Sequence, residues 1–376
     1  MKVERHRHRR HRQCRMWMHF FFERTTILRY CSKAQRQRRL EVGLCSILIA
    51  CMEFPSWLVA YRPLVPLKSL VTEINSIYHS FDATKYDAEH AEIRLLWPGL
   101  WTEMIDQLPQ RDCWRVLDFG CGTGFEAEQL LRTLGSGIDF LVAYDPSEEM
   151  LARAKKRLRN NPKVIFSERL ENARAHGPYN LLTTNSVLHH LADIDETIFN
   201  LQPFLSDDAY WLCGNEPSSR FYKNVNCIQL FEQYAAYRKR TKWFQPARYI
   251  AKIKSVFGMN SLSATAGKAL ERGLFATRPS ETAIARLVDF HVHHLSDDVN
   301  AGRGLDLAKV QSAFSPHWSL RWHKTYSYLG AFSELGAPQQ WRDKSKMLKA
   351  QFPEDGANFC AVWFRAGTST VLGNSK

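Results

Sequence analysis

Three glycines at alternate positions follow an acidic residue near the middle of the chain, in the stretch Arg-Val-Leu-Asp-Phe-Gly-Cys-Gly-Thr-Gly from Arg115 to Gly124. An apolar run precedes them and helix-like sequence follows, which predicts a strand, a tight turn and a helix. Glycine suits such a turn because the backbone bends sharply and a ligand approaches where a Cβ atom would collide. Free amides at the start of the helix would face that ligand. The stretch therefore predicts a nucleotide-binding bend.

A second interpretation of the same glycines is a dinucleotide site. Gly122, Gly124 and Ala127 have the spacing G-x-G-x-x-A, which is one form of the NAD or FAD fingerprint. A glycine turn that binds no ligand is a third interpretation. The glycines alone do not separate these alternatives, so the surrounding elements must decide.

Strands and helices are predicted to alternate after Cys113, which indicates a parallel sheet covered on both faces. The predicted strands are Trp114–Phe119, Phe140–Tyr144, Lys163–Ser167, Tyr179–Thr184 and Tyr210–Cys213, and the helices between them are Phe125–Leu134, Ser147–Arg159 and Asp193–Leu205. Nearer the N-terminus, helices are predicted over Leu67–Tyr78 and His90–Leu108, and towards the C-terminus a helix over Leu305–Phe314 precedes strands over Ser319–Leu329 and Ala357–Arg365.

Two segments carry a family resemblance. The pattern acid-x-Gly-x-Gly-x-Gly, from Asp118 to Gly124, resembles motif I of the class I S-adenosylmethionine-dependent methyltransferases. The sequence Val-Leu-His-His-Leu from Val187 to Leu191 resembles the segment that follows the fourth strand in that family, and it favours a methyltransferase over a dehydrogenase. The resemblance implies an α/β, Rossmann-like sheet of seven strands with helices on both faces, an N-terminal helical lid and a helical insertion after strand five.

The resemblance also implies S-adenosylmethionine as cosubstrate, held mainly at the ends of the strands. Asp145 would accept both ribose hydroxyls through its two oxygens. The adenine contact stays open between Glu168 and Glu171, because no aspartate follows strand three. The predicted cosubstrate contacts are Asp118, Gly120, Cys121, Gly122, Gly124, Asp145, Pro146, Glu168, Asn185 and Ser186.

The acceptor side is less defined. His189 is the candidate catalytic base, since the pKa of histidine is close to working pH, although a buried structural role is the alternative. Tyr86, His190 and Glu216 are further substrate-side candidates, and Tyr86 is equally an aromatic packing residue. The expected acceptor is a small molecule or lipid-like compound, methylated on O, N or C. A methyltransferase-fold binding module without catalysis is the alternative function.

The chain divides into five predicted segments. These are an extension over 1–53, a helical cap over 54–110, a cosubstrate-binding core over 111–215, an insertion over 216–304 and the end of the core over 305–376. The extension is expected to be disordered, and the apolar run Val42–Met52 is too short to span a membrane. The insertion is rich in aromatic and basic residues, either for packing or for acceptor specificity.

Charge and cysteine content limit the partners. Residues 1–40 hold 13 of the 51 Lys and Arg but only two of the 38 Asp and Glu, so the remainder of the chain is close to neutral. Nucleic acid is therefore an unexpected partner. The nine cysteines are odd in number and form no CxxC pair, which favours a reducing cytoplasm over a disulfide framework. No metal is predicted, although Asp289, His291 and His293 lie close in sequence; the oligomeric state is open.

Overall fold

The computed structural model describes residues 54–90, 92–241, 260–292, 303–314, 318–330 and 334–365. The structural statements below concern these residues. The predicted disorder of residues 1–53 and the placement of His293 lie outside them, as does the aromatic stretch from Trp243 to Tyr249.

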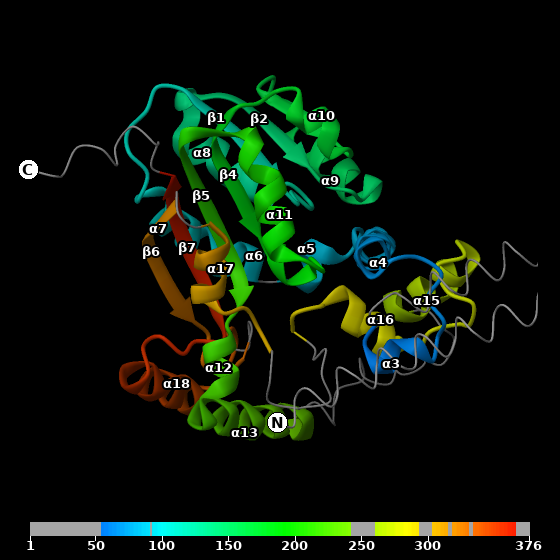
Figure 1. Cartoon of the computed structure of the whole chain (residues 1–376). Coiled ribbons are helices and arrows are strands. Elements are labelled where there is room, and N and C mark those ends of the chain that lie inside the picture. The colour runs from blue at the N-terminus through cyan, green and yellow to red at the C-terminus, as the bar shows by residue number, and fades with distance from the viewer. Residues whose placement is uncertain are drawn as a thin grey trace, which may run out of the picture. The chain divides into compact units, whose positions relative to one another are not determined.

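Seven strands form one sheet with the order β3-β2-β1-β4-β5-β7-β6 (Figure 1). Strands β1 to β5 run parallel, whereas β7 pairs antiparallel with both β5 and β6. This order confirms the predicted methyltransferase-type fold. The strands are β1 (Trp114–Phe119), β2 (Ile138–Tyr144), β3 (Val164–Ser167), β4 (Tyr179–Asn185), β5 (Leu205–Pro217), β6 (Trp318–Tyr326) and β7 (Asn358–Arg365).

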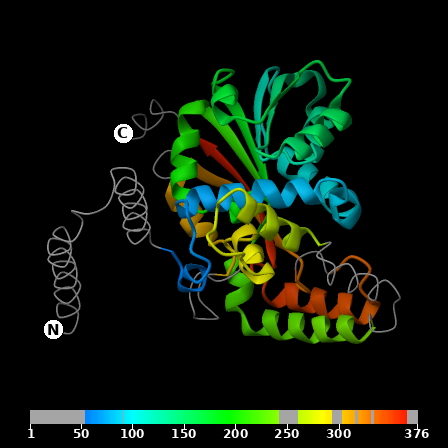
Figure 2. The same cartoon turned by 90° about the vertical axis from the view of Figure 1, so that its right-hand side faces the viewer.

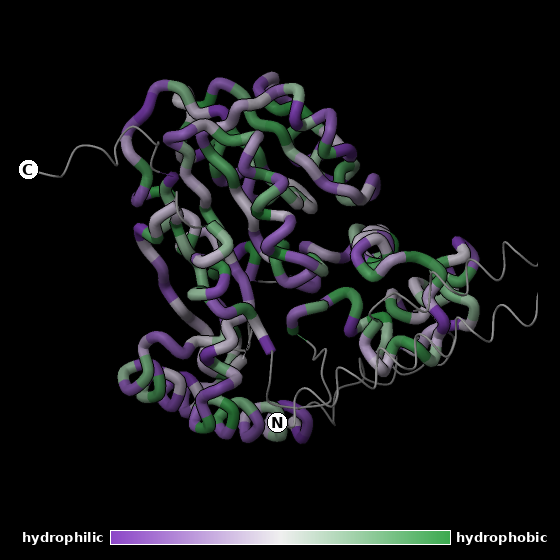
Figure 3. The backbone as a smooth tube through the Cα atoms, in the orientation of Figure 1, coloured by the Kyte–Doolittle hydropathy of each residue, from purple (hydrophilic) through white to green (hydrophobic). Residues whose placement is uncertain are grey.

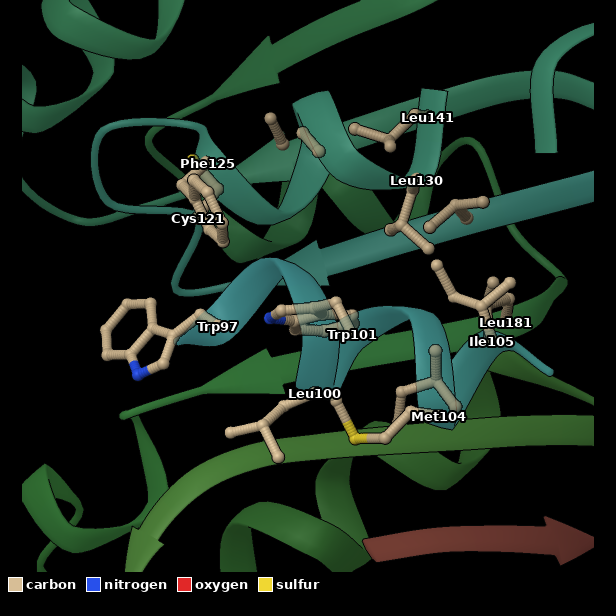
Figure 4. Close-up of a cluster of buried hydrophobic side chains, with 14 of the residues drawn as sticks. Trp97, Leu100, Trp101, Met104, Ile105, Cys121, Phe125, Leu130, Leu141 and Leu181 are labelled. Carbon is tan, nitrogen blue, oxygen red and sulfur yellow. The ribbon is translucent and has the colours of Figure 1, made fainter. Parts of the chain in front are cut away.

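Helices cover both faces of the sheet because alternate strand residues point to opposite sides. Val116 and Leu181 pack against one layer of helices, whereas Leu117 and Leu182 pack against the other. The first layer contains α7 (Trp97–Ile105), α8 (Phe125–Leu134) and α9 (Glu148–Leu158), and the second contains α10 (Leu170–Arg174), α11 (Ile194–Leu201) and α17 (Leu307–Phe314). Figure 4 shows part of the first core, where Trp101 of α7 and Leu130 of α8 approach the strands. Figure 3 shows hydrophobic residues along the strands.

The predicted helix ends agree with local capping. Ser147 accepts a hydrogen bond from the Met150 amide at 3.3 Å and begins α9, and Asp193 accepts one from the Glu196 amide at 2.8 Å and begins α11. The helix predicted to reach Leu205 ends earlier, at Leu201, and continues as a 3-10 turn over Gln202–Phe204. Pro203 explains the change, because proline cannot donate the next helical hydrogen bond.

Two other predicted elements have different bounds. The helix predicted over His90–Leu108 is α6 (Glu92–Leu95) followed by α7, with Pro98 in the first turn of α7. Strand β5 is longer than the predicted Tyr210–Cys213, because it begins at Leu205, which pairs with Tyr179 of β4, and pairing with β7 carries it to Pro217.

A helical cap combines segments that lie far apart in the sequence. Helices α3 (Ser56–Val59) and α4 (Leu67–Asp82) share one hydrophobic cluster with α15 (Ser261–Glu271) and α16 (Glu281–Val288). Figure 2 shows α4 beside the two helices of the insertion. The Leu64 amide also donates to the Leu274 carbonyl at 2.9 Å. Part of the insertion therefore folds together with the N-terminal helices, and α5 (Tyr86–Glu89) leads from this cap to the sheet.

Two other described helices of the insertion pack elsewhere. Helices α12 (Ser219–Lys223) and α13 (Val225–Thr241) form a separate cluster with α18 (Gln339–Gln351). Tyr234 and Tyr237 lie 5.1 and 5.5 Å from the Trp341 ring, measured between ring centroids, so packing accounts for these two aromatics. No helix among the described residues has the length and apolar character of a membrane span.

The insertion leaves and rejoins the core at one point. The Leu305 amide donates to the Pro217 carbonyl at 2.7 Å, and the Ser219 amide donates to the Leu305 carbonyl at 2.9 Å. These hydrogen bonds join the two ends of the segment 219–304 at the end of β5.

Candidate active site

A cavity of about 300 Å³ lies at the carboxyl ends of β1, β2 and β4. This is the edge of an open α/β sheet at which ligands bind. Residues of α4 and the segment around α5 also line the cavity, so the cap contributes to its wall. The lining includes these predicted site residues: Tyr86, Gly120, Cys121, Gly122, Asp145, Pro146, Asn185, Ser186 and His190.

The glycine bend is held between β2 and the segment after β4. The amides of Gly120 and Cys121 both donate to the Tyr144 carbonyl at 2.8 Å. Gly120 has a φ of 78°, and a Cβ atom added there would lie 2.5 Å from Cγ2 of Val187. A residue with a side chain at position 120 therefore meets both backbone strain and a steric clash.

We expect Gly120→Ala to lower the free energy of unfolding by about 2 kcal/mol, from positive φ and overpacking together. Urea denaturation measures this loss. Gly135→Ala is the control, because Gly135 has a φ of 54° but no atom lies within 4 Å of its added Cβ. Adding Val187→Ala to Gly120→Ala should restore part of the loss. Equal losses at Gly120 and Gly135 would show that the contact with Val187 has no energetic effect.

Asp145 is fixed through both oxygens, one by the glycine bend and the other by the start of α9. The Gly122 amide donates to Oδ2 at 2.9 Å and the Ser147 amide donates to Oδ1 at 2.8 Å. The side chain is buried, which raises the pKa of Asp145 to about 6 although the two amides act in the opposite direction. Each oxygen retains a lone pair, so the carboxylate can still accept hydrogen bonds from a ligand.

Two further buried carboxyl groups lie at the bend. Asp118 accepts from Thr183 Oγ1 at 2.9 Å through Oδ1, while its buried Oδ2 has no hydrogen-bond partner among the described residues. Burial raises the pKa of Asp118 to about 7, and the charge of Asp145 adds to this. Glu126, in the first turn of α8, accepts from the Asn185 side chain, and burial together with Asp118 raises the pKa of Glu126 well above its usual value. This acidic set fits a positively charged ligand group.

These shifts predict how stability changes with pH. An Asp with a raised pKa binds its proton more tightly in the folded protein, so the free energy of unfolding should fall as pH rises from about 4 to about 7. Asp118→Asn should lose less stability than the wild type between pH 5 and pH 8 in urea denaturation of ligand-free protein. Asp139→Asn, at an exposed position of β2, is the control and should follow the wild type. Identical curves for all three proteins would contradict the role of Asp118.

Glu216 organises the segment after β4. Its side chain is 0% exposed, and it accepts hydrogen bonds from the amides of Val187 and Leu188 at 2.8 Å each and of His189 at 3.2 Å. It also contacts His189 Nδ1 at 2.8 Å. Glu216 is thus engaged behind the cavity and does not line it, although the sequence placed it on the substrate side.

The two adjacent histidines differ in environment. Burial lowers the pKa of His189, but the charge and hydrogen bond of Glu216 outweigh this and leave it raised. His190 donates from Nδ1 to the Val288 carbonyl at 2.6 Å, and burial with the nearby His189 lowers the pKa of His190 to about 4. Of the two, only His190 lines the cavity. The neutral histidine at the cavity is therefore His190, and the candidate base His189 does not line it.

Among the described residues, one group of side chains has metal-ligand spacing. It consists of His189, His190 and Asp289, whose ligand atoms lie within 4.8 Å of one another. Nδ1 of each histidine already has a hydrogen-bond partner, in Glu216 and in the Val288 carbonyl. Asp289 lies 4.0 Å from His189 Nε2. An ion-pair network centred on His189 describes these contacts.

The structure also places residues that the sequence did not single out. Asn75 and His79 of α4 line the cavity one helical turn apart, and Asn75 Oδ1 and His79 Nδ1 are buried without a hydrogen-bond partner among the described residues. Their i, i+4 spacing on a mostly apolar helix face indicates that the two side chains share one face, so the sequence could have identified them. Glu168 and Glu171 are exposed and do not line the cavity, whereas the intervening Leu170 does.

Comparison with known proteins identifies the domain. Residues 117–210 match a family described as "Methyltransferase domain". The malonyl-[acyl-carrier protein] O-methyltransferase of Bacillus anthracis is 32% identical over 98 residues, which are 26% of this chain and 36% of the relative. The enzyme of the same name from Halalkalibacterium halodurans is 26% identical over 166 residues, 43% of this chain and 55% of the relative. The chain thus spans between about a third and about half of these curated relatives.

Solved structures show weaker similarity. The plantazolicin methyltransferase BpumL, in a complex with S-adenosylhomocysteine, is 15% identical, covers 80% of this chain and 97% of its own, and has a TM-score of 0.40. A S-adenosylmethionine-dependent methyltransferase from Aquifex aeolicus is 18% identical, covers 37% and 73%, and has a TM-score of 0.31. The family match over residues 117–210 is what decides against the dinucleotide interpretation of the glycine bend.

Proposed function

We propose that this chain, which carries a class I S-adenosylmethionine-dependent methyltransferase domain, transfers a methyl group from S-adenosylmethionine to a small-molecule or lipid-like acceptor. The observation that supports this most directly is the acidic set at the glycine bend. Asp118 leaves a buried carboxylate oxygen without a partner among the described residues, and Glu126 lines the cavity beside the backbone of Gly120 and Gly122. The methyl donor carries both an ammonium and a sulfonium charge, so it is a chemically suitable ligand for such a site.

The proposed roles of the binding residues follow from their contacts. Glu126, which lines the cavity, would hold the ammonium of the amino-acid end, with the Asp118 carboxylate buried behind the lining, and Asp145 would accept the ribose hydroxyls. When bound, S-adenosylmethionine supplies a methyl group on a positively charged sulfur, which an aligned acceptor atom can displace. Tyr86 and the residues of α4 would cover the cavity and exclude water. The protein thus contributes mainly orientation and charge, which is sufficient for an in-line transfer.

The acceptor would lie against the wall formed by His79, His190 and Tyr86, all of which line the cavity. A neutral His190, bound to a carbonyl through Nδ1, leaves Nε2 as a hydrogen-bond acceptor for an acceptor hydroxyl. Because the curated relatives are named O-methyltransferases, oxygen is the first acceptor atom to test, followed by nitrogen and carbon. We also propose a cytoplasmic location, because the methyl donor is made there.

Isothermal titration with S-adenosylmethionine, S-adenosylhomocysteine and NAD tests the proposal. We expect the first two to bind and NAD to give no heat. Release of S-adenosylhomocysteine in a screen of small hydroxy and carboxylic acids would then identify the acceptor class. Binding without turnover on any acceptor would favour a methyltransferase-fold binding module, and failure of both sulfur ligands to bind would reject the proposal.

A further inference from the structure

A second cavity, of about 470 Å³, lies beside the first between the segment around α5 and α6 and the helices α8 and α9. Ile93 and Phe125 line both cavities and separate them. The lining of the second cavity contains four arginines and two acids. These are Arg94, Arg132, Arg153, Arg157, Asp87 and Glu128.

The acids do not neutralise the arginines. Arg157 donates to the Asp87 carboxylate, and Glu128 lies 3.9 Å from Arg157 and 3.7 Å from Arg132. Arg94 donates only to the Asp87 carbonyl, at 3.4 Å. Arg153 forms no hydrogen bond or ion pair with any residue in the described ranges. The cavity therefore holds an excess of positive charge, with the Arg153 guanidinium uncompensated.

The arginines converge from three helices. Arg153 and Arg157 are four residues apart on α9, so they share one face of that helix, while Arg132 belongs to α8 and Arg94 to α6. Like charges at this spacing repel one another unless an anion lies between them. Guanidinium groups match phosphate oxygens through paired N–H donors. Thr84 and Gln129 also line the cavity and add neutral hydrogen-bonding groups.

We propose that this cavity is an anion site that binds a phosphate group, with Arg153 as its main ligand and Arg157 and Arg94 as further donors. The site takes a second ligand, distinct from the methyl donor and from the acceptor at His190, so it goes beyond the proposed methyl transfer.

The same site is connected to the cosubstrate cavity through Asp87. Asp87 accepts from Thr123 Oγ1 of the glycine bend at 2.7 Å and also from Arg157. Tyr86, the preceding residue, lines the first cavity. A phosphate that binds Arg157 competes with Asp87 and weakens the ion pair that attaches α5 to α9. Anion binding is therefore coupled to the segment that covers the cosubstrate cavity.

Titration calorimetry with pyrophosphate in low-salt buffer tests the site on the full chain. We expect saturable binding, which Arg153→Gln weakens at least about tenfold, since it removes a charge-assisted hydrogen-bond donor. Arg159→Gln is the matched control: it removes the same charge at the end of the same helix, outside the cavity lining, and should leave affinity unchanged. No saturable binding, or equal weakening by both variants, overturns the proposal.

Asp87→Asn gives an independent readout. Because it removes the carboxylate that competes for Arg157, it should tighten pyrophosphate binding several-fold while circular dichroism shows an intact fold. Weaker or unchanged binding in this variant contradicts the site. Titrating glycerol 3-phosphate beside inorganic phosphate shows whether the group binds free or on an organic molecule. None of these measurements depends on methyl transfer, so failure here leaves the proposed function standing, and the reverse also holds.

Discussion

Glu216→Ala is expected to lower the free energy of unfolding by about 3–5 kcal/mol, the range for removing one partner of a buried charged pair. The side chain is fully buried and accepts hydrogen bonds from three backbone amides and from the His189 imidazole. Its loss leaves these donors buried without an acceptor, and the segment from Val187 to His190 loses its anchor. Urea denaturation at pH 7 measures the effect.

The control for Glu216 is Glu103→Ala, which removes a more exposed ion pair with Lys324. Exposed pairs contribute about 0–1 kcal/mol, so this loss should be small. The coupling between Glu216 and His189 also has a pH signature. Since the folded-state pKa of His189 is raised, its contribution is present at low pH and is lost as pH rises through that pKa. A loss below about 1 kcal/mol for Glu216→Ala would contradict its anchoring role.

Asp145→Ala is expected to weaken S-adenosylmethionine binding by about 3 kcal/mol, roughly 100-fold in Kd. The variant removes the proposed acceptor of the ribose hydroxyls and also the oxygens that fix the amides of Gly122 and Ser147. Asp145→Asn retains one oxygen, so its affinity for S-adenosylmethionine should fall between that of Asp145→Ala and that of the wild type. Titration calorimetry measures all three affinities.

Asp139→Ala is the matched control for Asp145, because Asp139 lies on β2, the strand that Asp145 follows, but is exposed. Its affinity for S-adenosylmethionine should equal that of the wild type. Affinity unchanged by Asp145→Ala would reject the ribose role, and circular dichroism of each variant separates lost binding from lost folding.

The parallel half of the sheet was predictable because each strand is a short buried apolar run that ends at a glycine or polar residue. Strand β5 was predicted too short, since Asp207 and Asp208 have the composition of a turn. Pairing with β4 is made by Leu205 and Tyr210 on either side of these two aspartates, and such an irregular start of a strand has no local sequence pattern. The joint packing of α4 with α15 likewise depends on contacts between distant segments.

The site residues were predictable where a residue of suitable chemistry stands at the end of a predicted strand. Gly120 and Asp145 stand at strand ends and line the cavity. Glu126 was not predicted, because an acid in the first turn of a helix is ordinarily explained by the helix dipole. Glu216 was identified as a candidate, but the direction of its side chain could not be predicted, because the pairing of β5 with β7 shifts register between Cys213 and Glu216. Its hydrogen bonds with the amides after β4 show which side it faces.

The hydrogen bonds that join Ser219 and Pro217 to Leu305 have an engineering consequence. The two ends of the segment 219–304 are adjacent in space. The length and sequence of this segment therefore do not affect the register of β5. A corresponding segment from another enzyme can then be transplanted between these points without shifting Glu216. The graft must bring an apolar surface for Leu70 and Ile74 of α4, because helices of this segment pack against α4, which also lines the cavity.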